Sequence, residues 1–574
     1  MSQPGLRSFR EVWFVDFEFK SQPGCIPEPV CMVAVELLTG REIRLWQDEL
    51  AACPQPPYST CQGSLIVAYY ASADIGCHLA LGWPIPLNIL DLYAEFRCLT
   101  NGLVLAYGGG LLGAQLYFGL DCIATHEKEY MRDLAQNGGP WTTDERNQIM
   151  EYCHSDVMAL QRLVNAMAGK LSMPHALVRG QYMGAAARME HTGVPIDVDA
   201  LVKLQSHWSQ IQDALIQSID RNYQVYEGRT FKRRKWERFV RDNGIPWPIL
   251  DSGELDLKDE TFREMARSHP IVAPMHELRT TLSKMKLSEL EVGPDGRNRL
   301  ILSAFSSKTG RNQPSTSKFI FGPATWIRGL IRPESGMGIA YVDWEQQEFG
   351  IAAALSGDPL MLEAYQSGDP YLAFAKQARA IPENATKESH GVERNKFKAC
   401  VLAVQYGMGA KSLSHRIGCS EYEASELLRL HRVTYRVFWR WSDAVVDYAG
   451  LYRRLWTVFG WEMHYVGEIN PRSVRNFPMQ ANGAEMLRLA CCFATERGVK
   501  VCAPVHDAIL IEFDLADEEA AISQTQEAMR EASTIVLNGF ELRTEVKTVR
   551  YPDRYMDERG QQMWETIWKI IEDL

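Results

Sequence analysis

Residues 501–512 read VCAPVHDAILIE, the stretch that decides the fold of the C-terminal half of the chain. Two apolar runs flank His506-Asp507, which predicts two strands joined by a tight turn that carries a carboxylate. Residues 338–349 read GIAYVDWEQQEF and predict a buried strand that delivers Asp343 at its end. Taken alone, an aspartate at a strand end is more often a turn former or a helix cap than a catalytic group.

Two carboxylates that meet at the tips of apolar strands repel each other, which raises the pKa of one of them unless a divalent cation bridges the pair. Mg²⁺ prefers carboxylates together with substrate phosphates. Two such ions can activate a 3′-hydroxyl and stabilise a leaving pyrophosphate. Asp343 and Asp507 are therefore candidate metal ligands.

Between these two acids, residues 394–407 read RNKFKACVLAVQYG. Arg394, Lys398, Leu402 and Tyr406 recur every four residues, so they spread over one broad side of a predicted helix. The two cations can hold a triphosphate, and Arg394 can grip it through two hydrogen bonds. For this helix alone, a solvated cationic face above an apolar core remains an equal alternative.

The order of these three segments resembles motifs A, B and C of the family A DNA polymerases, and the resemblance covers about residues 177–550. Three further segments match the family. Thr309-Gly310-Arg311 is similar to a primer-contact motif, and Arg472-x3-Asn476-x3-Gln480 is similar to the helix along the minor groove. Residues 188–197 are similar to the entry into the polymerase domain. The resemblance implies a DNA polymerase that binds primer-template DNA and dNTPs and uses two Mg²⁺ or Mn²⁺ ions at each active site.

The same resemblance implies a role for each matching residue. Asp343 and Asp507 would bind both metals, and Lys398 would be the general acid for pyrophosphate. The nucleotide contacts would be Arg394 and Lys398 on the phosphates, Leu402, Tyr406 over the templating position, and Glu348, which excludes a 2′-hydroxyl. The DNA contacts at the primer terminus and the minor groove would be Arg311, Arg472, Asn476, Gln480 and His506. That groove carries a degenerate pattern of acceptors, so contacts there check pair geometry without reading sequence.

Four positions depart from the family pattern. Leu402 stands where Phe or Tyr is usual, Ala508 where motif C usually ends in Glu, Gly350 where motif A continues to Arg, and Trp461 where Arg is common. None of these departures removes a metal ligand, but Ala508 leaves two carboxylates at the polymerase site rather than three.

A second set of acids lies near the N-terminus. Asp16 and Glu18 share one face of a strand predicted over 12–20, and Tyr152 and Asp156 share one face of a helix predicted over 143–168. With Asp74, which follows an apolar run at 64–70, these residues make up what a second two-metal phosphodiesterase needs. Separately, each acid is a common surface charge. Helices are also predicted near 74–82 and 89–97.

Together these five residues resemble the 3′–5′ exonucleases of the DEDD class, in the subclass that has a tyrosine. The resemblance implies that Asp16, Glu18, Asp74 and Asp156 bind two metals and that Tyr152 orients the attacking water. Because this set begins at Asp16, we expect no 5′-nuclease domain ahead of it, and the compact form resembles phage or prophage enzymes. Use of 2,6-diaminopurine in place of adenine is a further expectation that no residue encodes visibly.

Residues 230–244 read TFKRRKWERFVRDNG, a basic run with aromatic residues between the cations. At helical spacing the aromatic rings can anchor the helix while Lys232, Arg233 and Arg234 face DNA phosphates. A solvated helix face is the alternative. Residues 429–441 read RLHRVTYRVFWRW, and we expect these rings to form a core rather than a base-stacking platform.

Bulk properties exclude several classes of protein. The net charge is -11, so nucleic-acid binding has to come from local basic clusters. The 13 cysteines form no CxxC pair, which indicates a reducing compartment. No signal peptide and no apolar run of about 18 residues is present, so we expect a cytoplasmic monomer with no membrane contact.

The sequence thus predicts an α/β and α+β multidomain chain. We expect a ribonuclease-H-like exonuclease domain over 1–172 and a right-hand polymerase over 173–574, with a thumb at about 198–298, a palm at about 299–358 and 465–574, and fingers at about 359–464. The alternatives are an exonuclease whose second half binds DNA but is inactive, a single-subunit RNA polymerase, and a non-catalytic replication scaffold. Replication accessory proteins are not predicted by any pattern.

Overall fold

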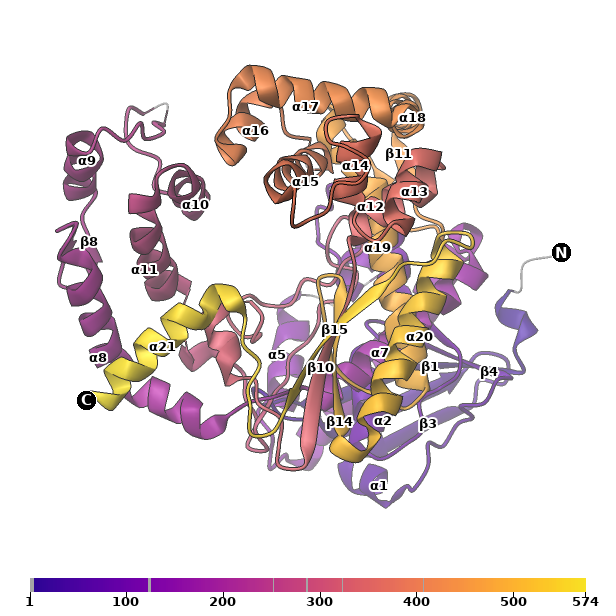
Figure 1. Ribbon diagram of the computed structural model, residues 1–574. Coiled ribbons are helices and arrows are strands. Elements are labelled where there is room, and N and C mark those ends of the chain that lie inside the picture. The colour runs from indigo at the N-terminus through magenta and orange to yellow at the C-terminus, as the bar shows by residue number, and fades with distance from the viewer. Residues whose placement is uncertain (1–4, 122–124, 251, 285–286, 323, 406) are drawn as a thin grey trace.

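The computed structural model describes residues 5–121, 125–250, 252–284, 287–322, 324–405 and 407–574. The two largest sheets have five and four strands. Figure 1 shows helices packed on both and two helical arms that rise from the second sheet. The fold is mixed α/β, as the sequence predicted.

The N-terminal sheet has the strand order β3-β2-β1-β4-β5. Its strands are β1 (Glu11–Lys20), β2 (Glu28–Glu36), β3 (Glu42–Trp46), β4 (Ser64–Ala68) and β5 (Ile89–Asp91). β1 is antiparallel to β2 and parallel to β4, so this strand lies at the centre and is covered by helix α6 (Thr143–Met167). The other helices of this region are α1 (Gln47–Ala52), α2 (Ser72–Ala80), α3 (Leu92–Thr100), α4 (Leu111–Tyr117) and α5 (Thr125–Gln136).

One expected helix begins later than its sequence indicated. We expected helical structure over 89–97, but residues 89–91 form β5, which pairs with β4 in parallel. The apolar residues of β5 are fully buried beside β4, and burial in a sheet outweighs their helical propensity. Asp91 ends the strand and caps α3, because its carboxylate accepts the backbone N–H of Ala94 at 2.8 Å.

Two long helices, α7 (Met173–Thr192) and α8 (Val198–Asp220), are separated at Gly193. Gly193 has a φ of 65°, and a Cβ there would lie 2.7 Å from Cγ of Arg299, so a larger residue is excluded. α8 leads into an arm of helices α9 (Arg233–Asp242), α10 (Asp259–Ser268) and α11 (Ala273–Lys284). Between these helices lie the short strands β7 (Tyr226–Glu227) and β8 (Thr230–Phe231), while β6 (Val194–Pro195) pairs with β9 (Arg297–Asn298).

The second sheet is antiparallel, with the order β13-β14-β10-β15. Its strands are β10 (Met337–Trp344), β13 (Lys500–Val505), β14 (Ala508–Asp514) and β15 (Thr544–Arg550). One face packs on helices α19 (Pro471–Glu496) and α20 (Glu518–Val536) through Ala340, Val342 and Ile509. The opposite face belongs to a core shared with helix α21 (Glu558–Glu572), and the carboxylates at the end of β10 lie on that side.

A second arm contains most of the helices between β10 and β13. It consists of α12 (Gln347–Ser356), α13 (Pro359–Gln366), α14 (Pro370–Gln377), α15 (Gly391–Gln405), α16 (Ala410–Ile417), α17 (Glu421–Thr434), α18 (Arg436–Tyr452) and the hairpin β11 (Arg454–Trp456) and β12 (Glu462–His464). Figure 1 shows α15 to α18 at the top, across from α9 to α11. Of the aromatic run at 429–441, Tyr435 and Phe438 are buried around His431, which agrees with the expected core.

Candidate active sites

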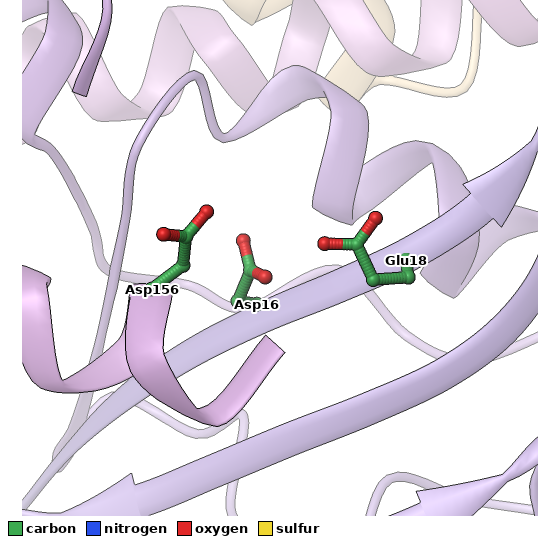
Figure 2. A group of neighbouring side chains, drawn as sticks. All are labelled: Asp16, Glu18 and Asp156. Carbon is green, nitrogen blue, oxygen red and sulfur yellow. The ribbon is translucent and has the colours of Figure 1, made fainter. Parts of the chain in front are cut away.

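Three N-terminal carboxylates converge on one point. Asp16 and Glu18 lie two residues apart on β1, so they project from one face of the sheet, and Asp156 faces them from α6. Ligand oxygens of all three lie within 4.8 Å of one another. Figure 2 shows Asp16 between the other two acids. This is the arrangement of oxygen ligands that a divalent cation accepts.

Asp74 and Tyr152 lie beside this group. Asp74 is buried on α2, and its Oδ1 accepts the backbone N–H of Phe17 at 3.1 Å. Burial, and then the negative charge of Asp16, raise the pKa of Asp74 well above its ordinary value. Asp74 is not a member of the three-residue group within 4.8 Å, so the structure places it next to the predicted ligands rather than among them. Tyr152 is buried one helical turn before Asp156.

Asp343 and Asp507 meet at one end of the second sheet. Asp343 is the penultimate residue of β10, and its partner across β14 is Ala508, the residue that follows Asp507 in the turn. Burial, and then the charges of Asp507 and Glu545, raise the pKa of Asp343 to about 7. Burial also raises the pKa of Asp507. The sequence therefore folds into a pair of acids that resist carrying both charges without a cation.

The residues present fit a divalent cation. Oδ1 of Asp343 is buried and has no hydrogen-bond partner among the residues that the structure describes. A buried carboxylate oxygen without a donor costs free energy unless a cation satisfies it. Asp343 and Asp507 supply the hard oxygen donors that Mg²⁺ and Mn²⁺ prefer.

A cavity of about 360 Å³ opens beside these acids. Its lining residues are Arg311, Gln346, Gln347, Glu348, Phe349, Tyr371, Leu402, Gln405, His506 and Asp507. Burial raises the pKa of Glu348, and the positive charge of Arg311 opposes that rise. The predicted residues Glu348, Leu402 and Arg311 are thus brought together around one hollow next to Asp507.

The two predicted phosphate-binding cations lie on α15 at the margin of this cavity. The Arg394 guanidinium lies 5.4 Å and the Lys398 ammonium 5.6 Å from the ring centre of Tyr371. Arg394 also forms an ion pair with Asp369, whereas Lys398 is exposed. A phosphate at this point has to displace the Asp369 carboxylate from Arg394 or share the guanidinium with it. Tyr406, the predicted aromatic of this motif, lies outside the described residues.

A second cavity, of about 440 Å³, continues from the first through Arg311 and His506, which line both. The turn that carries Arg311 is held by a side-chain hydrogen bond to its backbone, because Arg488 Nη1 donates to the Gly310 carbonyl at 2.5 Å. Trp461, one of the departures from the family pattern, donates its indole N–H to the Lys308 carbonyl at 3.1 Å and packs under Gly310. Trp461 therefore supports the position of the predicted primer contact.

Arg472, Asn476 and Gln480 follow one another at four-residue spacing along α19. The side chains of Asn476 and Gln480 are partly exposed and make no hydrogen bond within the described part of the chain. Arg472 is exposed next to Gly407, where a Cβ would lie 2.5 Å from its Cγ. Gly407 has a φ of 61°, so this position needs glycine both for its backbone angle and for the close approach.

The basic run of the first arm is partly neutralised. Lys232 forms an ion pair with Glu227 at 3.2 Å, and Arg233 pairs with Glu254. Arg234 is exposed and has no ion pair among the described residues. The aromatic residues between these cations form the core of the arm, with Trp236 fully buried. The structure keeps the cations at the surface, although two of the three predicted contacts have acidic partners.

Sequence reasoning missed two residues of the C-terminal site. Tyr371 separates the α15 cations from the cavity, and its pattern DPYLAF indicated only a capped helix. Glu545 faces Asp343 from β15, a strand whose polar alternation gave no sign of a site. Both depend on long-range pairing that no local pattern contains.

Comparison with known proteins identifies the class of protein. The model of the family "DNA polymerase family A" matches residues 257–550, slightly more than half of the chain. The chain therefore belongs to DNA polymerase family A.

Relatives agree with that assignment. A thermostable DNA polymerase I of Thermus caldophilus is 26% identical over 69% of this chain and 50% of its own length. The chain spans about half the length of the first of these curated relatives, but 81% of it aligns with 85% of a DNA polymerase I of Aquifex aeolicus, at 24% identity. A solved structure described as the "POL domain of Pol1 from M. smegmatis complex with DNA primer-template and dNTP" has the same fold, with a TM-score of 0.71 over 94% of this chain and 95% of that one at 17% identity.

A search of the described residues for a helix long and apolar enough to span a membrane found none.

Proposed function

We propose that this chain is a template-directed DNA polymerase that extends a primer with dNTPs. The observation that carries the proposal is the meeting of Asp343 and Asp507, beside a cavity lined by Arg311, Glu348 and Leu402. In this proposal residues 173–574 are the polymerase domain, with α8 to α11 as the thumb, the sheet of β10 as the palm and α13 to α18 as the fingers. Membership of the polymerase family supports it.

The chemistry follows from where each residue lies. When bound, two divalent cations lower the pKa of the primer 3′-hydroxyl and offset the charge that develops on the leaving pyrophosphate. Asp343 and Asp507 hold these ions, and neutralising the two carboxylates is itself favourable because their charges repel. Lys398 and Arg394 hold the phosphates, and the Lys398 ammonium donates a proton to pyrophosphate. Glu348 occupies the space beside the sugar, where its half-buried side chain excludes a 2′-hydroxyl.

We propose that residues 1–172 are a 3′–5′ exonuclease domain that removes mispaired primer ends. Asp16, Glu18 and Asp156 supply the oxygen ligands of a cation site, and the buried carboxyl group of Asp74 lies next to it. The phenol of Tyr152 orients the water that attacks the terminal phosphodiester. A replicative role in a phage or prophage stays a prediction.

Acceptance of 2,6-diaminopurine is open to a direct test. Its 2-amino group presents in the minor groove the same donor that guanine presents, so a site that accepts G·C pairs has room for it. We propose that its deoxynucleoside triphosphate competes with dATP opposite template thymine. Strong discrimination in favour of dATP in a competition assay contradicts this part of the proposal.

Primer extension tests the polymerase. With Mg²⁺, dNTPs and a labelled primer-template, we expect Asp343→Ala and Asp507→Ala to lower the extension rate by at least about a thousandfold, because each removes a metal ligand. Asp514→Asn, at the other end of β14, is the matched control and should extend like the parent. Normal extension by either alanine variant would overturn the proposal. A parent that degrades primers but never extends them would favour the alternative, an exonuclease with an inactive polymerase half.

A further inference from the structure

Asp343 has a neighbour on each side within the second sheet. Across β14 that neighbour is Ala508, and across β15 it is Glu545. Directly opposed residues of an antiparallel pair project from the same face, with their Cβ atoms about 4.5–5.5 Å apart. The Glu545 side chain therefore leaves the sheet on the side of Asp343, whereas Ala508 brings no polar group to that side.

Glu545 is available to a ligand. It is exposed, and its side chain takes part in no hydrogen bond or ion pair within the part of the chain that the structure describes. The nearest cations on β15 and just before it are engaged elsewhere. Lys547 donates to the Met556 carbonyl at 2.6 Å, and Arg543 pairs with Glu345 at 3.0 Å. No basic side chain of this strand neutralises Glu545.

The charge of Glu545 reaches the polymerase acids. After burial and Asp507, it is the next cause that raises the pKa of Asp343. The same negative charge acts on the buried Oδ1 of Asp343, which has no hydrogen-bond donor among the described residues. Three carboxylates thus face one region, and among the cations Arg311 acts on Asp507. A divalent cation stabilises such an arrangement.

We propose that Glu545 is a third carboxylate of the divalent-cation site formed by Asp343 and Asp507, contributed from β15 at the position where β14 offers only Ala508. This inference rests on the proposed polymerase function and adds a ligand to that same site. The glutamate side chain is one methylene longer than aspartate, so it can reach toward the sheet end from a neighbouring strand. The ligands would then be Asp343 on β10, Glu545 on β15 and Asp507 in the turn before β14.

The proposal is tested by measuring Mn²⁺ binding to the full-length protein without DNA or nucleotide. Electron paramagnetic resonance reports the concentration of free Mn²⁺ and therefore the affinity. Every variant carries Asp16→Asn and Glu18→Gln, so that the N-terminal acids do not contribute. We expect Glu545→Gln to weaken binding at the remaining site about tenfold, the size of effect seen when a supporting group of a metal site is removed. Asp514→Asn is the control of equal charge change on the same sheet and should bind like the parent.

A relocated carboxylate separates a local role from a general charge effect. Adding Ala508→Glu to the Glu545→Gln variant puts an acid on the other side of Asp343, and we expect it to restore most of the lost Mn²⁺ affinity. Unchanged affinity in Glu545→Gln, while Asp343→Asn loses binding, overturns the role of Glu545 and leaves the polymerase site standing. Unchanged affinity in both variants overturns the metal site on which the proposed function depends.

Discussion

Asp16, Glu18 and Asp156 come from one strand and one helix of the same region, whereas Asp343 and Asp507 meet only when strands far apart in the sequence pair. The N-terminal group already has three ligand oxygens within 4.8 Å. The C-terminal pair has Asp343 on β10 and Asp507 in the turn before β14, and Glu545 on β15 is a third carboxylate directly opposite Asp343. The first site therefore depends on how one helix packs on one strand, and the second depends on the register of a whole sheet.

The difference has a consequence for how each site tolerates change. In the N-terminal group, Asp156 lies on α6, so a change at this residue does not alter the strand that carries Asp16 and Glu18. In the second sheet, a slip by one residue would turn Asp343 to the opposite face, away from Asp507. Both faces of β10 pack on apolar cores, and these oppose that slip because it would move the Asp343 carboxylate into the core that holds Ala340 and Val342.

The largest expected effect concerns only the N-terminal group of Asp16, Glu18 and Asp156. Asp156→Asn keeps the size of the side chain and removes one charge from the three-carboxylate group, so we expect 3′–5′ degradation of a single-stranded primer to slow by about a thousandfold. Primer extension should continue at the rate of the parent. Degradation at the rate of the parent would show that Asp156 holds no catalytic ion.

A buried ion pair connects the two regions. Arg179 on α7 pairs with Glu95 on α3, both almost fully buried, and Arg179 also donates to the Phe459 carbonyl at 2.9 Å. Arg179→Met leaves the buried Glu95 charge unpaired, so we expect a loss of about 3–5 kcal/mol of stability in urea unfolding. Arg429→Met, which breaks an exposed pair with Glu426, is the control and should cost under about 0.5 kcal/mol. An unchanged unfolding midpoint for Arg179→Met would mean that the regions are not joined there.

The smallest expected effect is a dependence on pH at the same junction. Burial raises the pKa of Glu190 to about 7, and its carboxylate accepts the N–H of Leu302 at 2.8 Å, just before the turn of Arg311. Because the folded pKa lies above the ordinary 4.5, the folded state holds the proton more tightly. The stabilisation from this group is complete below about pH 4.5 and is lost as the pH rises through 7.

Glu190→Gln keeps the acceptor for Leu302 and cannot ionise. We therefore expect its melting temperature to exceed that of the parent at pH 8 by a few degrees, and the gain to shrink as the pH approaches 5. Thermal unfolding followed by circular dichroism at the two pH values measures this. A gain that is equal at both pH values, or no gain at pH 8, contradicts the account of Glu190.

The sequence predicted those parts of the molecule whose pattern is local. The patterns at 12–20, 338–349 and 501–512 placed Asp16, Glu18, Asp343 and Asp507 on strands or at a turn where the structure has them. The strand at 89–91 was missed because three buried residues give too short a pattern to separate from the helix that follows. Glu545, Tyr371 and the partners of Arg394 and Arg233 were missed because they arise from contacts between distant segments.

The central claim is that one chain carries two separate acid sites with opposite effects on a primer. Asp16→Asn and Asp507→Asn, assayed side by side on one primer-template with Mg²⁺, test it most directly. We predict that Asp507→Asn shortens the primer without dNTPs but cannot lengthen it with them, and that Asp16→Asn lengthens it but cannot shorten it. Loss of both activities in either variant, or retention of both, would contradict the claim.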